Sequence, residues 1–255
     1  MNPALPLPLL ALLLVFAPSP VRSNPPSPEP TVAQLIAQAD ELYRSQTSHS
    51  RLEMDIETPH WQRRLVMEIW TRGMDETLIH IEAPKKDAGT ATLRRQQAMW
   101  NYFPRIDKVM KVPPSMMMSA WMGSDFTNDD LVKETSLLEK YDAELLQPEG
   151  ADPAFYYIDL VPKERTPTVW GRIRVVVRRT DLLPVREEFY DERGRQMRRM
   201  EFADVGNLGG RRVPTTITVR PLGKEGHSTT IRYLEAQFDL ELAPDQFSLR
   251  NLRRR

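Results

Sequence analysis

Period-two alternation of apolar and polar residues runs through most of this 255-residue chain and limits its fold more than any other feature. In RLEMDIE (residues 51–57), Leu52, Met54 and Ile56 alternate with charged side chains, and RRLVMEIWTRG (residues 63–73) continues the pattern. Such alternation is typical of a β-strand with one buried and one solvated face. A dozen or so segments of this kind follow at spacings of about 10–15 residues, with turn-forming residues between them. The sequence therefore predicts a long antiparallel meander and not a parallel sheet with crossover helices.

Only two segments have helical character. Residues 31–45 carry apolar side chains at helical spacing, and Thr31 after Pro30 is suited to cap that helix. A second helical insertion is expected near residues 116–134. An antiparallel sheet with one apolar face must bury that face. We therefore expect a mainly β protein with a few helices, whose sheet bends into an open barrel. So few helices would leave part of its concave apolar surface uncovered.

The N-terminus has the pattern of an export signal. LPLLALLLVFA (residues 7–17) is apolar but shorter than the roughly 20 residues that a membrane-spanning helix needs. Val21 and Ser23 fit the −3 and −1 positions of a cleavage after Ser23. We expect a signal peptide at residues 1–23, a proline-rich linker at residues 24–30 and a single domain at residues 31–255. Because nothing basic precedes the apolar core, an uncleaved anchor in the inner membrane is the alternative.

Composition and motifs indicate no reaction. The formal net charge is zero, so no bulk electrostatic field would draw the chain to nucleic acid. The chain has no cysteine, which excludes disulfides, thiolate catalysis, cysteine-bound metal and a lipid-modified N-terminal cysteine. Its four histidines show no ligand spacing, and the common hydrolase and nucleotide-binding motifs are missing from the sequence. We expect no enzymatic activity, no cofactor and no metal.

The stretch KVPPSMMMSAWMGSDFTNDDL (residues 111–131) is unusual for a soluble protein. Pro113 and Pro114 end the preceding strand, since proline cannot donate to a strand ladder. Thr127 can cap a helix from Asn128, with Asp130 completing an approximate capping box, which explains the acidic cluster better than a calcium loop does. Between prolines and cap lie flexible apolar side chains, namely Met116, Met117, Met118, Trp121 and Met122. They either plug one end of the barrel or form a mobile flap over a cavity for acyl chains.

The order of these segments resembles the outer-membrane lipoprotein-sorting protein family, which is related to the periplasmic carrier LolA and its receptor LolB. The most specific match is MGSDF (residues 122–126) followed by Asp129, Asp130 and Leu131, and MWNYFP (residues 99–104) is a second. The resemblance covers essentially residues 24–255. It implies a half-open antiparallel β-barrel, closed on one side by helices, around an apolar cavity.

The resemblance also implies a function. We expect a periplasmic carrier that shields the acyl chains of a lipoprotein or another lipid during transfer toward the outer membrane. A bare chain of about 16 carbons costs roughly 12 kcal/mol in water, so a protein must cover it. The ligand-binding side chains are expected to be Met116, Met117, Met118, Trp121, Met122, Phe126, Trp100, Phe103 and Trp70. Expected partners are an inner-membrane transporter and an outer-membrane acceptor, and the protein is expected to be a monomer.

Two alternatives stay open at this stage. The chain differs from LolA in its long methionine-rich loop, so lipoprotein is only one candidate cargo. A non-enzymatic periplasmic adaptor of a membrane lipid exporter would bind protein instead of lipid. A lipid-processing or glycan-processing enzyme would need a polar cleft with converging carboxylates.

Overall fold

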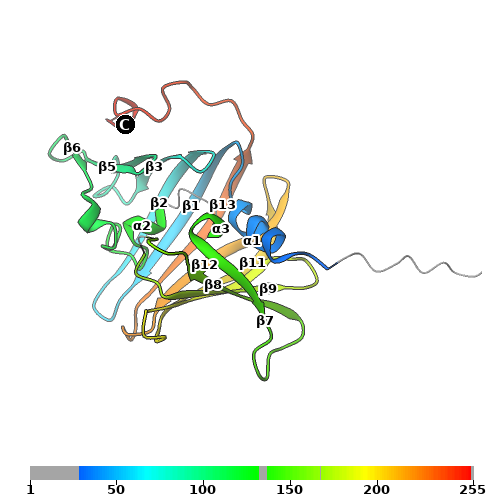
Figure 1. Cartoon of the computed structure of the whole chain (residues 1–255). Helices are drawn as coiled ribbons and strands as arrows, with labels where there is room; N and C mark the ends of the chain where they lie inside the picture. The colour runs from blue at the N-terminus through cyan, green and yellow to red at the C-terminus, as the bar shows by residue number, and fades with distance from the viewer. Residues whose placement is uncertain (1–28, 132–136, 167, 254–255) are drawn as a thin grey trace, which may run out of the picture.

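The computed structural model describes residues 29–131, 137–166 and 168–253, and these form one thirteen-stranded sheet with a few short helices (Figure 1). The strands are β1 (Thr47–Glu57), β2 (Gln62–Arg72), β3 (Glu76–Ala83), β4 (Ala91–Arg95), β5 (Ala98–Phe103), β6 (Lys108–Lys111), β7 (Tyr141–Leu146), β8 (Phe155–Pro162), β9 (Arg172–Arg178), β10 (Pro184–Tyr190), β11 (Gln196–Leu208), β12 (Arg211–Pro221) and β13 (Ser228–Phe238). The helices are α1 (Val32–Glu41), α2 (Asn128–Leu131) and α3 (Leu137–Lys140), with single 3-10 turns η1 (Pro114–Met116) and η2 (Asn251–Arg253). The predicted signal peptide and most of the linker lie outside the described residues.

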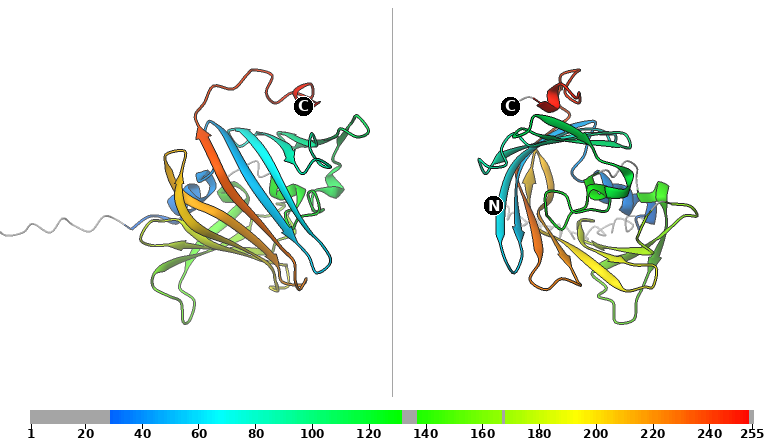
Figure 2. Two further views of the ribbon diagram at one scale, coloured as in Figure 1. Left: turned by 180° about the vertical axis from the view of Figure 1, so that it is seen from behind. Right: turned by 90° about the vertical axis from the view of Figure 1, so that its left-hand side faces the viewer.

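The sheet is a meander joined at one long-range pair. Its order is β6-β5-β4-β3-β2-β1-β13-β12-β11-β10-β9-β8-β7, with antiparallel neighbours throughout. Among the strands that the structure describes, only β1 and β13 pair across a large sequence separation, with Met54 opposite Ile231. The sheet curls into a half-open barrel whose edges are β6 and β7 (Figure 2). The predicted mainly β, antiparallel fold is confirmed.

The alternation assigns each strand residue to one of two faces. Leu52, Met54 and Ile56 of β1 are buried on the concave face. They lie opposite Met67, Leu65 and Arg63 of β2, respectively. The intervening charged residues point outward, as the sequence pattern predicts. The concave face carries the main apolar cluster, to which β1, β2, β3, β8, β9 and β12 all contribute.

Successive turns of an antiparallel meander lie at opposite ends of the sheet. We call the end with the turns at residues 73–75, 179–183 and 209–210 the helix end, because α1 lies beside it (Figure 1). The end with the turns at residues 58–61, 191–195 and 222–227 is the loop end. The right-hand view of Figure 2 looks onto the loop end, where the chain between β6 and α2 lies inside the curl of the sheet.

The concave face is covered more fully than the sequence suggested. Leu35 and Ile36 of α1 are buried in the main cluster, and Thr31 forms the predicted cap as a full capping box with Gln34. Trp121 and Phe126 from the loop after β6 join them. Our expectation that the few helices would leave part of this face uncovered was therefore too strong. The reason is that irregular chain, and not helix, supplies much of the cover.

Two further sequence predictions need correction. The expected helical insertion at residues 116–134 has helical structure only in η1 and α2 among its described residues, and turns connect them. The sequence SLLEKYDAELLQ (residues 136–147) also predicts a strand, but residues 137–140 form α3 ahead of β7. Leu137 is drawn into the main apolar cluster there, and its backbone N–H donates to Asp40 of α1 at 2.8 Å. Tertiary contact with α1 thus favours a helical turn.

The C-terminal segment (residues 239–253) crosses the convex face near β3, β4 and β5 (Figure 1). Phe247 and Leu252 pack there against Leu78, Leu93 and Tyr102. The sheet therefore has a second, smaller apolar cluster on its outer side. None of the described helices is long and apolar enough to cross a membrane.

Candidate functional site

The candidate site is the loop between β6 and α2, residues 112–127, which we call the methionine loop. Its four methionines do not behave alike. Met117 and Met122 are half-buried and pack against the main apolar cluster. Met116 and Met118 are 50% and 38% exposed. The loop thus has an inner side that belongs to the core and an outer side that presents flexible apolar side chains to solvent.

Trp121 anchors the loop on the concave face. Its side chain is buried, and its indole Nε1–H donates to Thr92 Oγ1 of β4 at 3.1 Å. The Trp121 backbone N–H also donates to the carbonyl of buried Phe126 at 2.8 Å, which closes a tight turn. Gly123 in that turn has a φ of +79°, a conformation that favours glycine. The MGSDF motif therefore forms a turn that places its own Phe126, and Trp121 just before it, in the barrel.

Polar contacts fasten the loop to strands at the loop end. The Asp125 backbone N–H donates to Thr229 Oγ1 of β13 at 2.9 Å, and that hydroxyl donates to Asp125 Oδ2 at 2.8 Å. Thr229 is fully buried. Arg63 of β2 donates to the Met122 carbonyl at 3.1 Å and pairs with Asp87 at 3.0 Å. These contacts reach the loop from widely separated strands.

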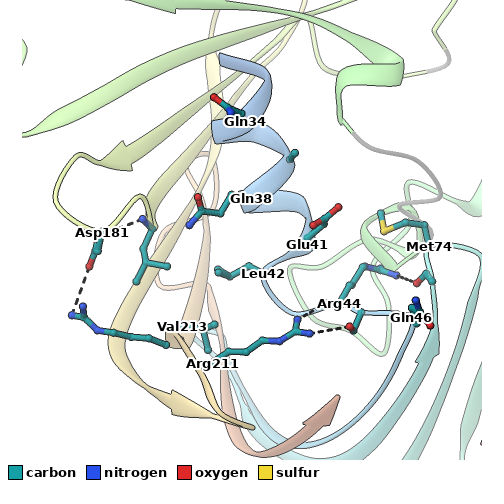
Figure 3. Close-up of a pocket in the computed structure, with 15 residues that line it drawn as sticks. Gln34, Gln38, Glu41, Leu42, Arg44, Gln46, Met74, Asp181, Arg211 and Val213 are labelled. Carbon is teal, nitrogen blue, oxygen red and sulfur yellow. Dashed lines mark hydrogen bonds and ion pairs between the residues drawn. The ribbon is translucent and has the colours of Figure 1, made fainter. Parts of the chain in front are cut away.

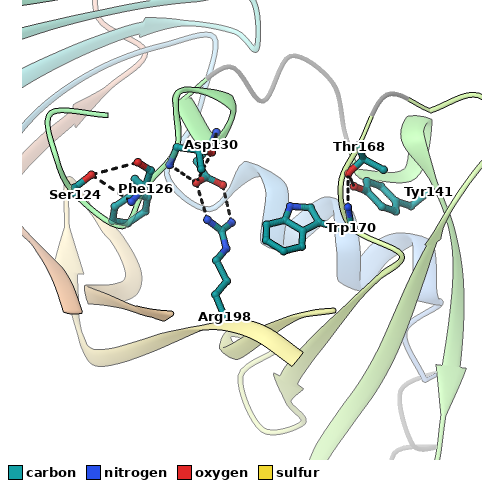
Figure 4. A network of polar contacts seen from close by, with 8 residues as sticks. Ser124, Phe126, Asp130, Tyr141, Thr168, Trp170 and Arg198 are labelled. Carbon is teal, nitrogen blue, oxygen red and sulfur yellow. Dashed lines mark hydrogen bonds and ion pairs between the residues drawn. The ribbon is translucent and has the colours of Figure 1, made fainter. Parts of the chain in front are cut away.

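A buried ion pair fixes the end of the loop. Arg198 of β11 donates two hydrogen bonds to the Asp130 carboxylate, at 2.7 and 2.6 Å (Figure 4). The two side chains are only 7% and 9% exposed. The guanidinium also lies over the Phe189 ring at 4.0 Å and near the Trp170 ring at 5.1 Å. Burial alone would lower the pKa of Arg198, but the hydrogen bonds and charge of Asp130 outweigh it and raise that pKa.

Asp130 has a second role at the start of α2. The Thr127 backbone N–H donates to Asp130 Oδ2 at 2.7 Å, and the Asp130 N–H donates to Thr127 Oγ1 at 3.1 Å. This is the predicted capping box with aspartate in place of glutamate. The cap could be predicted from the sequence because Thr127 and Asp130 are only three positions apart. It missed Arg198, whose pairing with Asp130 spans 68 positions.

The structure brings only some of the nine predicted ligand-binding residues together. Trp121, Phe126, Met117 and Met122 meet at the concave face, with Met116 and Met118 on the outside of the same loop. Phe103 is half-buried on β5, on the face that Asn101 shares. Asn101 accepts a hydrogen bond from Thr92, and Thr92 in turn accepts one from the Trp121 indole. Because Trp121 lies on the concave face, Asn101 and Phe103 also face that side.

Trp70 and Trp100 lie on the opposite side of the sheet. Both pack into the convex cluster with Leu78 and Leu93, beneath the C-terminal segment. Trp70 also stacks on His49, with ring centroids 4.8 Å apart. Neighbouring residues of a strand point to opposite faces of the sheet. The sheet itself therefore separates these two tryptophans from Trp121.

A cavity of about 970 Å³ opens at the helix end, away from the methionine loop (Figure 3). Its wall combines apolar side chains such as Leu42, Leu183 and Val213 with polar groups of α1 and three arginines. Arg211 donates to the Arg44 carbonyl at 2.7 Å and to Ser45 Oγ at 2.9 Å. The volume is in the range of small-molecule sites. We did not predict this cavity, since its walls come from three turns distant in sequence.

Two stacked tyrosines stand between this cavity and the main cluster. Tyr43 and Tyr233 have ring centroids 4.7 Å apart, with ring planes inclined by only 6°. Both pack against the main apolar cluster and also against the cluster of Leu42, Leu183 and Val213 at the cavity wall. The two rings thus connect the apolar cluster at the cavity wall to the main apolar cluster.

Comparison with known proteins defines the class to which this fold and loop belong. A family model described as an uncharacterized protein matches residues 73–254, which is most of the chain, and the chain belongs to that family. No curated protein sequence matches it.

Solved structures share the fold over nearly the whole chain. A DUF1329 family protein from Desulfovibrio piger has 24% identity and a TM-score of 0.75, covering 86% of this chain and 96% of its own. A domain assigned to outer-membrane lipoprotein sorting from Vibrio parahaemolyticus has 21% identity and a TM-score of 0.73, with coverages of 86% and 97%. A LolA superfamily protein from Nitrosomonas europaea has 19% identity and a TM-score of 0.73, with coverages of 88% and 100%. The resemblance to lipoprotein-sorting proteins is therefore confirmed in the fold.

Proposed function

We propose that this protein is a periplasmic carrier that holds the acyl chains of a lipid or lipoprotein against its concave face, beneath the methionine loop. The observation that carries the proposal is the loop itself. It covers an apolar barrel interior with non-covalent contacts only, and the chain has no cysteine that could tie it down. The shared fold with a lipoprotein-sorting domain supports the same assignment.

The energetics favour an exchange in which an acyl chain replaces the side chains of the methionine loop on the concave face. Moving Trp121 and Phe126 off the concave face would expose two large apolar side chains, at a cost of roughly 1.5–3 kcal/mol each. Breaking the Asp130–Arg198 pair would cost about 3–5 kcal/mol more if neither group found a new partner. Burial of an acyl chain of about 16 carbons returns roughly 12 kcal/mol. These terms nearly balance, which suits a protein that must both accept and release its cargo.

The order of events follows from this balance. Without cargo, the side chains of the loop fill the interior and the polar contacts hold it closed. A ligand that binds the open state better shifts the population toward it. Met116 and Met118, exposed on the outer side of the loop, would meet an entering chain first, and flexible thioether side chains adapt to varied shapes. No covalent bond is made or broken in this cycle, so the proposed function is not enzymatic.

The helix-end cavity offers additional room. Leu42, Leu183 and Val213 continue the apolar surface beyond the Tyr43–Tyr233 stack. A long chain entering from the loop end could reach this space if the two rings parted. In the proposal, residues 1–23 direct export, an inner-membrane transporter donates the cargo and an outer-membrane acceptor takes it.

Native mass spectrometry of the protein isolated from the periplasm, followed by lipid extraction, tests the proposal. We expect the protein to carry lipid and the variant Met116→Ser/Met117→Ser/Met118→Ser to lose most of it. Met197→Ser is the matched control, because Met197 is 39% exposed and lies on β11, outside the loop. Lipid-free protein that co-purifies with a transporter subunit would contradict the carrier and favour an adaptor.

A further inference from the structure

The turns at the loop end carry exposed apolar side chains at their tips. Trp61 lies in the turn between β1 and β2, Ile106 in the turn between β5 and β6, and Leu222 in the turn after β12. They are 44%, 58% and 50% exposed. Met116 and Met118 are exposed on the methionine loop, which lies within the curl of the sheet in the view onto this end (Figure 2). Single exposed apolar residues are ordinary, but several of them gathered on the turns at one end of the barrel are not.

The tips belong to one continuous rim. Gly226 lies so close to Pro59 that a Cβ on the glycine would be 3.0 Å from the proline Cγ, so the two neighbouring turns are in contact. Trp61 reaches the methionine loop, where its ring is 3.8 Å from the corresponding position on Gly123. The right-hand view of Figure 2 faces this rim and shows the loop framed by the strand turns.

The helix end differs sharply. Its turns at residues 73–75, 96–97, 147–154, 179–183 and 209–210 contain none of the large apolar side chains that are strongly exposed among the described residues. Glycine, glutamine and aspartate are common there instead. The apolar tips therefore mark one end of the barrel and do not reflect a general tolerance of exposed apolar residues in turns.

Cationic side chains accompany the tips. Lys85, Lys86 and Arg105 are exposed around a shallow cavity of about 610 Å³ beside Ile106, and Lys224 is next but one to Leu222. Tryptophan and lysine or arginine are the residues that prefer the boundary between headgroups and acyl chains. Asp107 and Glu225 at the same turns offset part of this charge. Burial of the apolar tips should therefore contribute more to binding than charge does.

We propose that the loop end docks on the surface of a bilayer containing anionic phospholipid, with Trp61, Ile106 and Leu222 in the interfacial layer. In this orientation the methionine loop faces the membrane, and the helix-end cavity faces away from it. The docking surface is independent of carriage, because a protein that holds no lipid could still bind a bilayer in this way. Label position on vesicles tests docking, whereas lipid extraction tests carriage.

The absence of cysteine from the sequence makes a site-specific test direct. We would label Ile106→Cys and Leu222→Cys with a polarity-sensitive fluorophore. Leu145→Cys and Leu234→Cys on β7 and β13 are matched controls, since Leu145 and Leu234 are similarly exposed but away from the rim. With vesicles of phosphatidylethanolamine and phosphatidylglycerol, the rim labels should shift to the blue and be quenched by brominated lipid. The control labels should not respond.

The outcomes decide the proposal. Equal responses at all four positions, or no response at the rim, would overturn it. As a second measure, Trp61→Ser/Leu222→Ser should weaken vesicle binding about tenfold or more, since two interfacial apolar groups are lost. The control Leu145→Ser/Leu234→Ser should bind as the parent does. Equal weakening by both double variants would also overturn the proposal, and unchanged melting temperatures would show that each variant is folded.

Discussion

At the scale of single residues, Asp130 and Arg198 connect the methionine loop to the barrel wall. The carboxylate caps α2 and also accepts both hydrogen bonds of a guanidinium that lies against Phe189. A buried charge is costly without its partner, so loss of either residue leaves the other in an unfavourable environment. This pair is a buried, doubly hydrogen-bonded link between β11 and α2, which follows directly on the loop.

Arg198→Met should therefore lower the free energy of unfolding by about 3–5 kcal/mol, because Asp130 stays buried without its cation. Arg51→Met is the control. Arg51 pairs with Glu82 at 2.8 Å, but the two side chains are 42% and 36% exposed. Its loss should cost at most about 1 kcal/mol. Urea unfolding of the three proteins measures both values, and equal costs for the two variants would show that burial of the Asp130 pair is unimportant.

The Tyr43–Tyr233 stack predicts a loss of stability in alkaline solution. Burial raises the pKa of Tyr233 to about 12, against the opposing influence of Arg44. Burial and neighbouring negative groups also raise the pKa of Tyr43 well above its ordinary value. In the unfolded chain both tyrosines ionise near pH 10. Between about pH 10 and 12 the unfolded state thus loses protons that the folded state keeps, and stability falls as pH rises.

Tyr233→Phe should make that fall shallower, since one of the ionising groups is gone. The measurement is the free energy of unfolding at several pH values from 8 to about 12, chosen to span the shift in pKa. Below pH 10 the slope should match that of the parent protein. A variant whose alkaline slope equals the parent's would show that Tyr233 ionises equally in both states.

At the scale of elements, the methionine loop divides into an anchor and an outer surface. Composition alone could not tell core from flap, because methionine and tryptophan suit both. The structure buries Trp121 and Phe126 and leaves Met116 and Met118 exposed. The burial agrees with the core hypothesis for Trp121 and Phe126, whereas the mobile flap stays a prediction.

This division has a measurable consequence for stability. Trp121→Ala should cost about 3–5 kcal/mol, since it removes a buried ring and the bond to Thr92. Met116→Ser/Met118→Ser should cost less than about 1 kcal/mol, because both side chains lie at the surface outside the apolar clusters. Thermal unfolding of both variants provides the comparison. A large loss from the methionine double variant would mean that the outer side of the loop is structural.

At the scale of the whole molecule, alternation predicted the strands and the two-faced sheet because period two depends only on local sequence. It did not tell which face would be concave. Trp100 and Met99 are neighbours in sequence, yet one lies in the convex cluster and the other in the main one. The pairing of β1 with β13 and the position of the C-terminal segment depend on long-range packing that carries no local signal. The helix-end cavity was missed for the same reason.

The central claim is that the methionine loop must leave the concave face for cargo to enter. Asp125→Cys/Thr229→Cys tests it most directly, since the two native side chains touch at 2.8 Å and the chain has no other cysteine. Uptake of a fluorescent fatty acyl probe would be measured in the oxidised and the reduced protein. We predict that the disulfide blocks uptake and that reduction restores it. Equal uptake by the oxidised and reduced forms would contradict the claim.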